Sequence, residues 1–125
     1  MVIAMLLVTS NKSKQLLYLS FIGTVRPEDF QKGRKDVATE LAGLSPGFLY
    51  LVDLTDLEFM GLECMTELGR LMDFIGQAGV GLLARVIPDP SKDIGMNILT
   101  AFHYPQGLRV VTCQDLNEAI GALGF

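Results

Sequence analysis

A nearly unbroken apolar run lies near the middle of the chain, and a stretch with helical spacing follows it. The run 48–54 contains β-branched and aromatic residues, which predicts a strand covered by helices on both faces. Apolar residues then recur every three or four positions and predict a helix with one apolar stripe: Leu62, Met65, Leu68, Leu71, Met72 and Ile75. The loop 55–61 between these elements leaves the carboxyl end of a central strand, where binding sites of α/β proteins lie.

The N-terminal part predicts a hairpin and a helix. Residues 2–9 and 15–22 are β-rich apolar segments, and the polar cluster 10–14 between them favours a turn. Gly23 ends the second segment, and Pro27 is tolerated at the first position of a helix. The apolar side of this helix is formed by Phe30, Val37, Leu41 and Leu44.

The C-terminal part predicts two more strands and two more helices. The apolar runs 80–87 and 108–112 are bounded by Gly or Pro and have the length of strands. The pair Asp89-Pro90 fits the start of a third helix. Its inward positions are Ile94, Ile98, Ala101 and Phe102. The segment from Thr112 to Asp115 resembles a capping box. The last helix follows it with apolar positions Leu116, Ala119, Ile120 and Leu123.

The element order is β-β-α-β-α-β-α-β-α, and the length of 125 residues fits one domain, residues 1–125. This order predicts an α/β fold with a single, mostly parallel five-stranded sheet and about four helices. The three crossovers should be right-handed and join parallel strands. The hairpin makes the first strand the antiparallel one.

Composition limits the classes of ligand. The net charge is −4, the isoelectric point is near 4.8, and the ten Lys and Arg residues are scattered. These values argue against nucleic acid or an anionic membrane as the main ligand, because both need a concentrated basic surface. Half of the residues are apolar and the mean hydropathy is +0.38, so apolar surface should remain for a partner or for a homodimer.

The sequence also predicts a compartment. The apolar run 2–8 has no basic residues before it and no small-residue cleavage pattern after it, and it is too short to span a bilayer. We therefore expect neither a signal peptide nor membrane insertion. The two cysteines, Cys64 and Cys113, form no CxxC motif and no disulfide scaffold, which fits a reducing cytoplasm.

The surroundings of Asp53 are similar to those of the phosphoacceptor in response-regulator receiver domains, where an Asp at a strand end precedes a Gly by eight residues, as Asp53 precedes Gly61. Receivers also need an acidic pair after the first strand and a Lys after the last strand. The first acidic residue here is Glu28 and the last Lys is Lys92. A phosphoryl group on Asp53 would therefore lack the charges that stabilise its transfer.

A second resemblance covers most of the chain. The element order and residues 52–60, Val-Asp-Leu-Thr-Asp-Leu-Glu-Phe-Met, resemble those that lead into the signature of the STAS domain, found in sulfate transporters and anti-sigma factor antagonists. The motif Leu68-Gly69-Arg70 is similar to the end of the signature helix. The small bacterial members are called SpoIIAA-like. The resemblance implies their fold and a regulatory, non-catalytic role in signalling through protein binding.

One position departs from the pattern of the antagonists. Their loop ends in Asp-Ser-Ser-Gly or Asp-Ser-Thr-Gly, and a partner kinase phosphorylates the second hydroxyl residue. This chain has Gly61-Leu62-Glu63-Cys64 there, so Glu63 places a permanent negative charge where phosphorylation would add one. We expect a module that binds a kinase-like protein or another regulator without the usual phosphoacceptor. The expected contact loop consists of Asp56, Leu57, Glu58, Phe59, Met60, Gly61, Leu62 and Glu63.

Two alternative functions stay open. A STAS-like branch that has been likened to lipid-binding SEC14-type folds also lacks the phosphorylated serine, which implies a carrier or sensor of a small apolar ligand in an internal pocket of some hundreds of Å³. An enzyme would need His103, Asp93, Asp53 or Cys64 in one cleft. We expect ordinary roles instead: turn bonds for Asp53 and Asp56, a helix-dipole contact for His103 and a plain helix position for Cys64. The sequence thus predicts no catalytic residues, no metal and no cofactor.

Overall fold

The structure is a computed structural model that describes residues 5–89, 97, 99–100 and 102–125. The chain order of its elements is β1 (Met5–Asn11), β2 (Leu16–Val25), α1 (Asp29–Leu41), β3 (Phe48–Asp53), β4 (Leu57–Met60), the 3₁₀ turn η1 (Leu62–Cys64), α2 (Met65–Gln77), β5 (Val80–Val86), β6 (Arg109–Cys113) and α4 (Leu116–Ala122).

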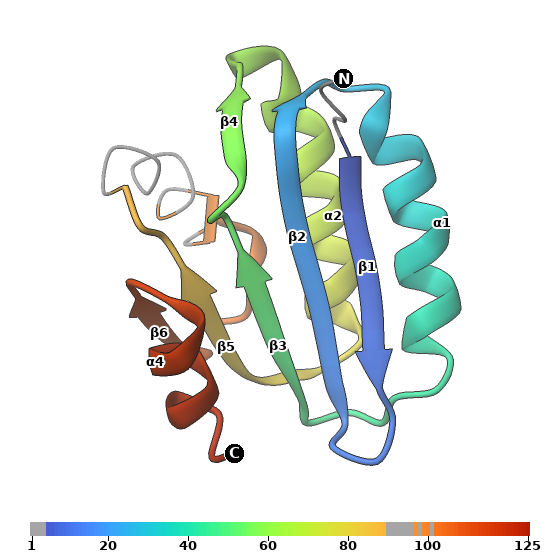
Figure 1. Ribbon diagram of the computed structural model, residues 1–125. Helices are drawn as coiled ribbons and strands as arrows, with labels where there is room; N and C mark the ends of the chain where they lie inside the picture. The colour runs from blue at the N-terminus through green and yellow to red at the C-terminus, as the bar shows by residue number, and fades with distance from the viewer. Residues whose placement is uncertain (1–4, 90–96, 98, 101) are drawn as a thin grey trace.

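The strands form one mixed sheet in the order β1-β2-β3-β5-β6, and β4 pairs separately with β2 (Figure 1). Strand β1 is antiparallel to β2, whereas the pairs of β2 with β3, β3 with β5 and β5 with β6 are parallel. The predicted α/β class and the antiparallel first strand are therefore confirmed.

In the described residues the sheet has six strands rather than the predicted five, because part of the predicted loop is strand β4. Strand β2 pairs with β3 through residues 16–20 and with β4 through residues 23–25. The prediction that Gly23 ends β2 is wrong. Gly23 has a φ of +72° and sits at an irregularity in the register with β4, a conformation that glycine adopts without a steric penalty. The backbone N–H of Gly23 then donates to the carbonyl oxygen of Asp56 over 2.9 Å.

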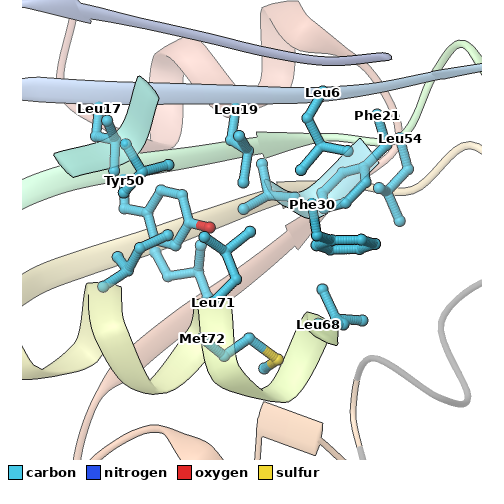
Figure 2. Packing of buried hydrophobic residues seen from close by; sticks show 14 of the residues in the cluster. Leu6, Leu17, Leu19, Phe21, Phe30, Tyr50, Leu54, Leu68, Leu71 and Met72 are labelled. Carbon is cyan, nitrogen blue, oxygen red and sulfur yellow. The ribbon is translucent and has the colours of Figure 1, made fainter. Parts of the chain in front are cut away.

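Helices α1 and α2 cover one face of the sheet, and α4 covers part of the other (Figure 1). The larger core lies between the sheet and α1 and α2. Figure 2 shows large side chains from both layers filling this space, among them Leu19, Phe21, Phe30, Tyr50, Leu68, Leu71 and Met72. The stripe predicted for α2 is buried or half-buried from Met65 to Ile75, so the sequence pattern identified the face that carries the helix.

A smaller core lies under α4. Ala119 and Leu123 are buried there against Leu51, Ala84 and Val86 of the sheet. The prediction that the last helix also buries Leu116 and Ile120 is wrong, since both side chains are exposed. The predicted cap is three residues too early as well. The N-cap is Asp115, whose carboxylate accepts from the backbone N–H of Glu118 over 2.8 Å.

Most of the predicted third helix lies outside the described residues, including Ile94, Ile98 and Ala101. Residues 97, 99–100 and 102–103 are helical. Phe102, which was expected to face inward, is 80% exposed, so that placement is wrong. None of the helices in the described part of the chain is long and apolar enough to cross a membrane.

Candidate functional site

The expected contact loop is an ordered projection at the carboxyl end of the central strand β3. It consists of β4 and the first residues of η1, and we call residues 56–63 the tip. Three features anchor it. The side chain of Leu57 is buried, Met60 packs against the main core, and the backbone N–H of Cys64 donates to the carbonyl oxygen of Gly61 over 3.1 Å. The tip therefore stands on a rigid base rather than on a free loop.

Two large apolar side chains of the tip remain exposed. Phe59 is 60% exposed and Leu62 is 86% exposed. The sequence placed Leu62 in the buried stripe of the following helix, and that placement is wrong. The segment from Leu62 to Cys64 is a 3₁₀ turn, and the α-helix begins only at Met65. Because the two helix types advance by different angles per residue, the stripe of α2 does not extend to Leu62.

The tip also carries exposed acidic side chains. Asp56, Glu58 and Glu63 are exposed on the tip itself. Burial raises the pKa of the Cys64 thiol, and the nearby negative charges of Glu63, Asp29 and Glu28 raise it further. Because Glu28 and Asp29 come from the start of α1, carboxylates from two segments converge on the same end of the molecule.

Gly61 leaves room for the Glu63 side chain. A Cβ atom at Gly61 would overlap the Glu63 carboxylate, which lies directly over this buried position. The small residue thus allows Glu63 to fold back along the tip. The exposed Glu63 therefore has its carboxylate over Gly61, and it follows the exposed Leu62 in the sequence.

Asp53 has a structural role at the base of the tip. It is buried, and its Oδ1 accepts from the backbone N–H and hydroxyl of Thr55 at 2.9 and 2.5 Å. Its Oδ2 accepts from the Tyr18 hydroxyl at 2.9 Å. Burial raises the pKa of Tyr18 to about 12, and the bond to Asp53 contributes. The predicted turn bond of Asp53 is thus confirmed. The described residues contain no group of three His, Cys, Asp or Glu side chains with the geometry of a metal site.

The residues named for an enzyme bond to separate partners. Cys64 is fully buried, and its thiol donates to the carbonyl oxygen of Val25 over 3.3 Å. His103 forms a bond of 2.9 Å between its Nδ1 and Oδ1 of Asp73 on α2, while Asp53 bonds to Tyr18 and Thr55. Asp93 lies outside the described residues. The described part of the chain therefore does not join these side chains into one cleft.

The packing of His103 and the burial of Arg85 were both missed by the sequence analysis. His103 lies against Gly69, where a Cβ would come within 2.8 Å of its Nε2. Arg85 is buried on β5 and donates to the side chains of Asn97 and Thr112 over 2.6 and 2.8 Å. The one signal for Arg85 in the sequence is a single charge inside the apolar run 80–87.

A ligand carrier would need an internal pocket. Side chains occupy the space between α1, α2 and the sheet in Figure 2. A hollow of about 320 Å³ lies instead at the surface, open to solvent and lined by Tyr104, Leu108 and Val110 among others. The predicted carrier function therefore stays a prediction.

The sequence comparisons give no family. No protein-family model matches the chain, and no curated protein matches it.

Solved structures match the fold over nearly the whole chain. An uncharacterized protein of the DUF3478 family with a SpoIIAA-like fold, from Shewanella loihica, has a TM-score of 0.75 at 17% identity, with 97% of this chain and 95% of that chain covered. An anti-sigma factor antagonist from Mycobacterium paratuberculosis has a TM-score of 0.60 at 17% identity, covering 97% and 94%. The anti-sigma factor antagonist SpoIIAA in its unphosphorylated form has a TM-score of 0.60 at 16% identity, covering 96% and 99%. The fold is therefore SpoIIAA-like, as the resemblance to the STAS domain implied.

Proposed function

We propose that this protein is a non-catalytic regulatory module that binds a protein partner through the tip. The observation that carries the proposal is the pair of exposed apolar side chains, Phe59 and Leu62, on a rigid base at the carboxyl end of β3. Exposed apolar side chains at one place often mark an interaction surface. The SpoIIAA-like fold supports the proposal, because two of the matched structures are anti-sigma factor antagonists.

The tip also suggests the chemistry of the partner. An aromatic side chain such as Phe59 can enter a pocket on the partner and provide much of the binding energy. Glu58 and Glu63 flank it, and Glu28 and Asp29 add charge at the same end. Acidic rim residues favour a basic partner and increase the association rate at low salt. The partner surface should therefore combine an apolar pocket with surrounding Lys or Arg residues.

The test compares variants of the tip with a matched variant elsewhere. Partners would be isolated from the native host with the wild-type protein and with the double variant Phe59→Ala, Glu63→Lys. The control is Phe74→Ala, which removes an exposed phenylalanine from the distant half of α2. We expect the double variant to lose the partner and the control to keep it, with circular dichroism showing that both are folded. Equal recovery by all three proteins would reject the tip as the contact surface.

A second test concerns the missing phosphoacceptor. Because Glu63 occupies that position, no ATP-dependent kinase of the antagonist type should label the tip. The nearby hydroxyl residues are Thr55 and Thr66, and mass spectrometry of protein purified from the host would examine both. Phosphate on either one would show that the switch has moved to another residue.

A further inference from the structure

We propose that the groove between β1 and α1 binds an extended polypeptide segment, which adds to the sheet as a strand beside β1. Strand β1 is at the end of the sheet, and in the described part of the chain β2 is its only strand neighbour. An edge strand presents a row of backbone N–H and C=O groups that another strand can pair with. Addition of an extended peptide to such an edge is a common mode of peptide recognition. This surface is separate from the tip.

Strand β1 lacks three of the features that can prevent pairing at an edge. Such strands commonly carry Lys, Pro or a β-bulge. The seven residues of β1 include no charged residue and no proline, and they pair with β2 in a continuous register. Met5 and Leu7, on the face opposite Leu6, are exposed. The edge is therefore straight, uncharged and partly apolar, as a template for an added strand should be.

Helix α1 forms one wall of a groove along this edge. It packs chiefly against β1 and lies alongside that strand in Figure 1. Gly33 permits the close approach, because a Cβ there would lie 3.0 Å from Cδ2 of Leu6. A hollow of about 230 Å³ lies between residues 5–8 of β1 and the α1 side chains Lys32, Asp36, Thr39 and Glu40. Side chains of an added strand would enter this hollow at alternate positions.

The position of α1 favours an extended segment over a second folded copy. Two copies of β1 could pair only as antiparallel strands around a two-fold axis perpendicular to the sheet. Both α1 helices would then lie on the same face of the joined sheet. Each helix would stand beside the β1 edge along which the other copy has to pair. An extended segment brings no such helix and leaves α1 in place.

The charges on the α1 wall indicate what the segment carries. Lys32 is paired with Asp36 over 3.2 Å. The Glu40 carboxylate accepts from the Ser10 hydroxyl over 2.9 Å. This donor is neutral, so the charge of Glu40 has no cationic partner in that bond. Among the α1 side chains that line the hollow, Lys32 carries a positive charge and Asp36 and Glu40 carry negative charges, so this lining has a net negative charge. The matching segment alternates apolar residues and places a Lys or Arg beside Glu40.

The experiment selects ligands for the groove itself. Random peptides of about twelve residues, enough to cover one edge strand, would be displayed on phage and selected on the immobilised wild-type protein. The variant Thr39→Trp, which fills the groove from the α1 wall, is present in excess in solution as competitor. The control is Thr66→Trp, which places the same side chain at another exposed helical threonine, on α2.

We expect enriched peptides that alternate apolar residues and contain a basic residue. They should bind wild type and Thr66→Trp equally, bind Thr39→Trp at least about tenfold more weakly, and slow the hydrogen exchange of β1 amides. Replacing the basic residue of an enriched peptide by Glu should weaken its binding to the wild-type protein. Failure to enrich any peptide, equal binding to Thr39→Trp, or protection away from β1 would overturn the proposal. A wild-type dimer that Thr39→Trp dissociates would also overturn it and assign the groove to a second copy.

Discussion

Helix α2 and the tip before it are neighbours in sequence and carry similar apolar side chains, but they use them differently. Leu68, Leu71 and Ile75 of α2 are almost completely buried against the sheet. Phe59 and Leu62 of the tip face solvent, although buried groups on either side hold the tip in place. The apolar surface of α2 therefore stabilises the fold, whereas that of the tip is left for another molecule.

The difference arises from the backbone. An α-helix repeats every 3.6 residues and keeps its apolar stripe on one face. The short strand β4 does not alternate strictly, because its register with β2 shifts between Leu57 and Phe59; it buries Leu57 and exposes both Glu58 and Phe59. A 3₁₀ turn then rotates Leu62 out of line with the stripe that begins at Met65. Similar residues in a continuous sequence thus have opposite roles on the two sides of Cys64.

The largest expected effect comes from replacing a leucine by Asp, once in α2 and once in the tip. Leu68→Asp buries a charge without a partner at a cost of several kcal/mol, comparable with the total stability of a small domain, about 5–15 kcal/mol. We expect this variant not to fold. Leu62→Asp should change the free energy of unfolding by less than about 0.5 kcal/mol, because its side chain is 86% exposed. Circular dichroism and urea unfolding compare the two variants. A cooperatively melting Leu68→Asp protein would contradict the assigned position of α2.

An intermediate effect is expected at the junction of the core and the tip. Asp53→Ala leaves the Tyr18 hydroxyl and the Thr55 N–H without their acceptor, at a cost of about 1–2 kcal/mol. Asp56→Ala is the control, because its side chain is exposed and only its backbone oxygen bonds to Gly23. Urea unfolding gives both values, and hydrogen exchange at Thr55 shows whether the tip loosens. Equal stability of the two variants would mean that Asp53 does not brace the tip.

The contrast between α2 and the tip also explains how much the sequence predicted. Long periodic segments such as residues 65–77, and apolar runs such as 48–54, gave the α/β class and the parallel sheet, because their patterns depend on burial alone. Strand β4 was missed because its four residues pair with an extension of β2 beyond Gly23, a long-range contact without a local signal. Exposure at Leu62, Leu116 and Ile120 was missed for a similar reason, since apolar spacing does not show where a covering surface ends.

A smaller effect is expected in the ionisation of the three tyrosines. Burial raises the pKa of Tyr18 to about 12, and it also raises the pKa of Tyr50 and Tyr104. These groups favour their neutral form when folded, so the contribution of Tyr18 to stability is complete below pH 10 and is lost as pH rises through about 12. The ultraviolet absorbance of phenolate should therefore stay low at pH 10 in the folded protein. Tyr18→Phe should remove the phenolate that forms near pH 12. A phenolate signal near pH 10 before unfolding would contradict the burial of these hydroxyl groups, which is the main cause of their raised pKa.

The smallest effect on the fold is expected from a new thiol at an exposed position of the tip. Cys64 and Cys113 are buried, and burial raises the pKa of both thiols, so little thiolate is available to react with Ellman's reagent. Leu62→Cys adds a thiol two residues before Cys64 at a position that is almost fully exposed. We expect one fast-reacting thiol per chain in this variant and none in the folded wild type, with unchanged unfolding curves. Rapid labelling of wild-type Cys64 would show that the tip opens without global unfolding, and its apolar side chains would then not be presented from a rigid base.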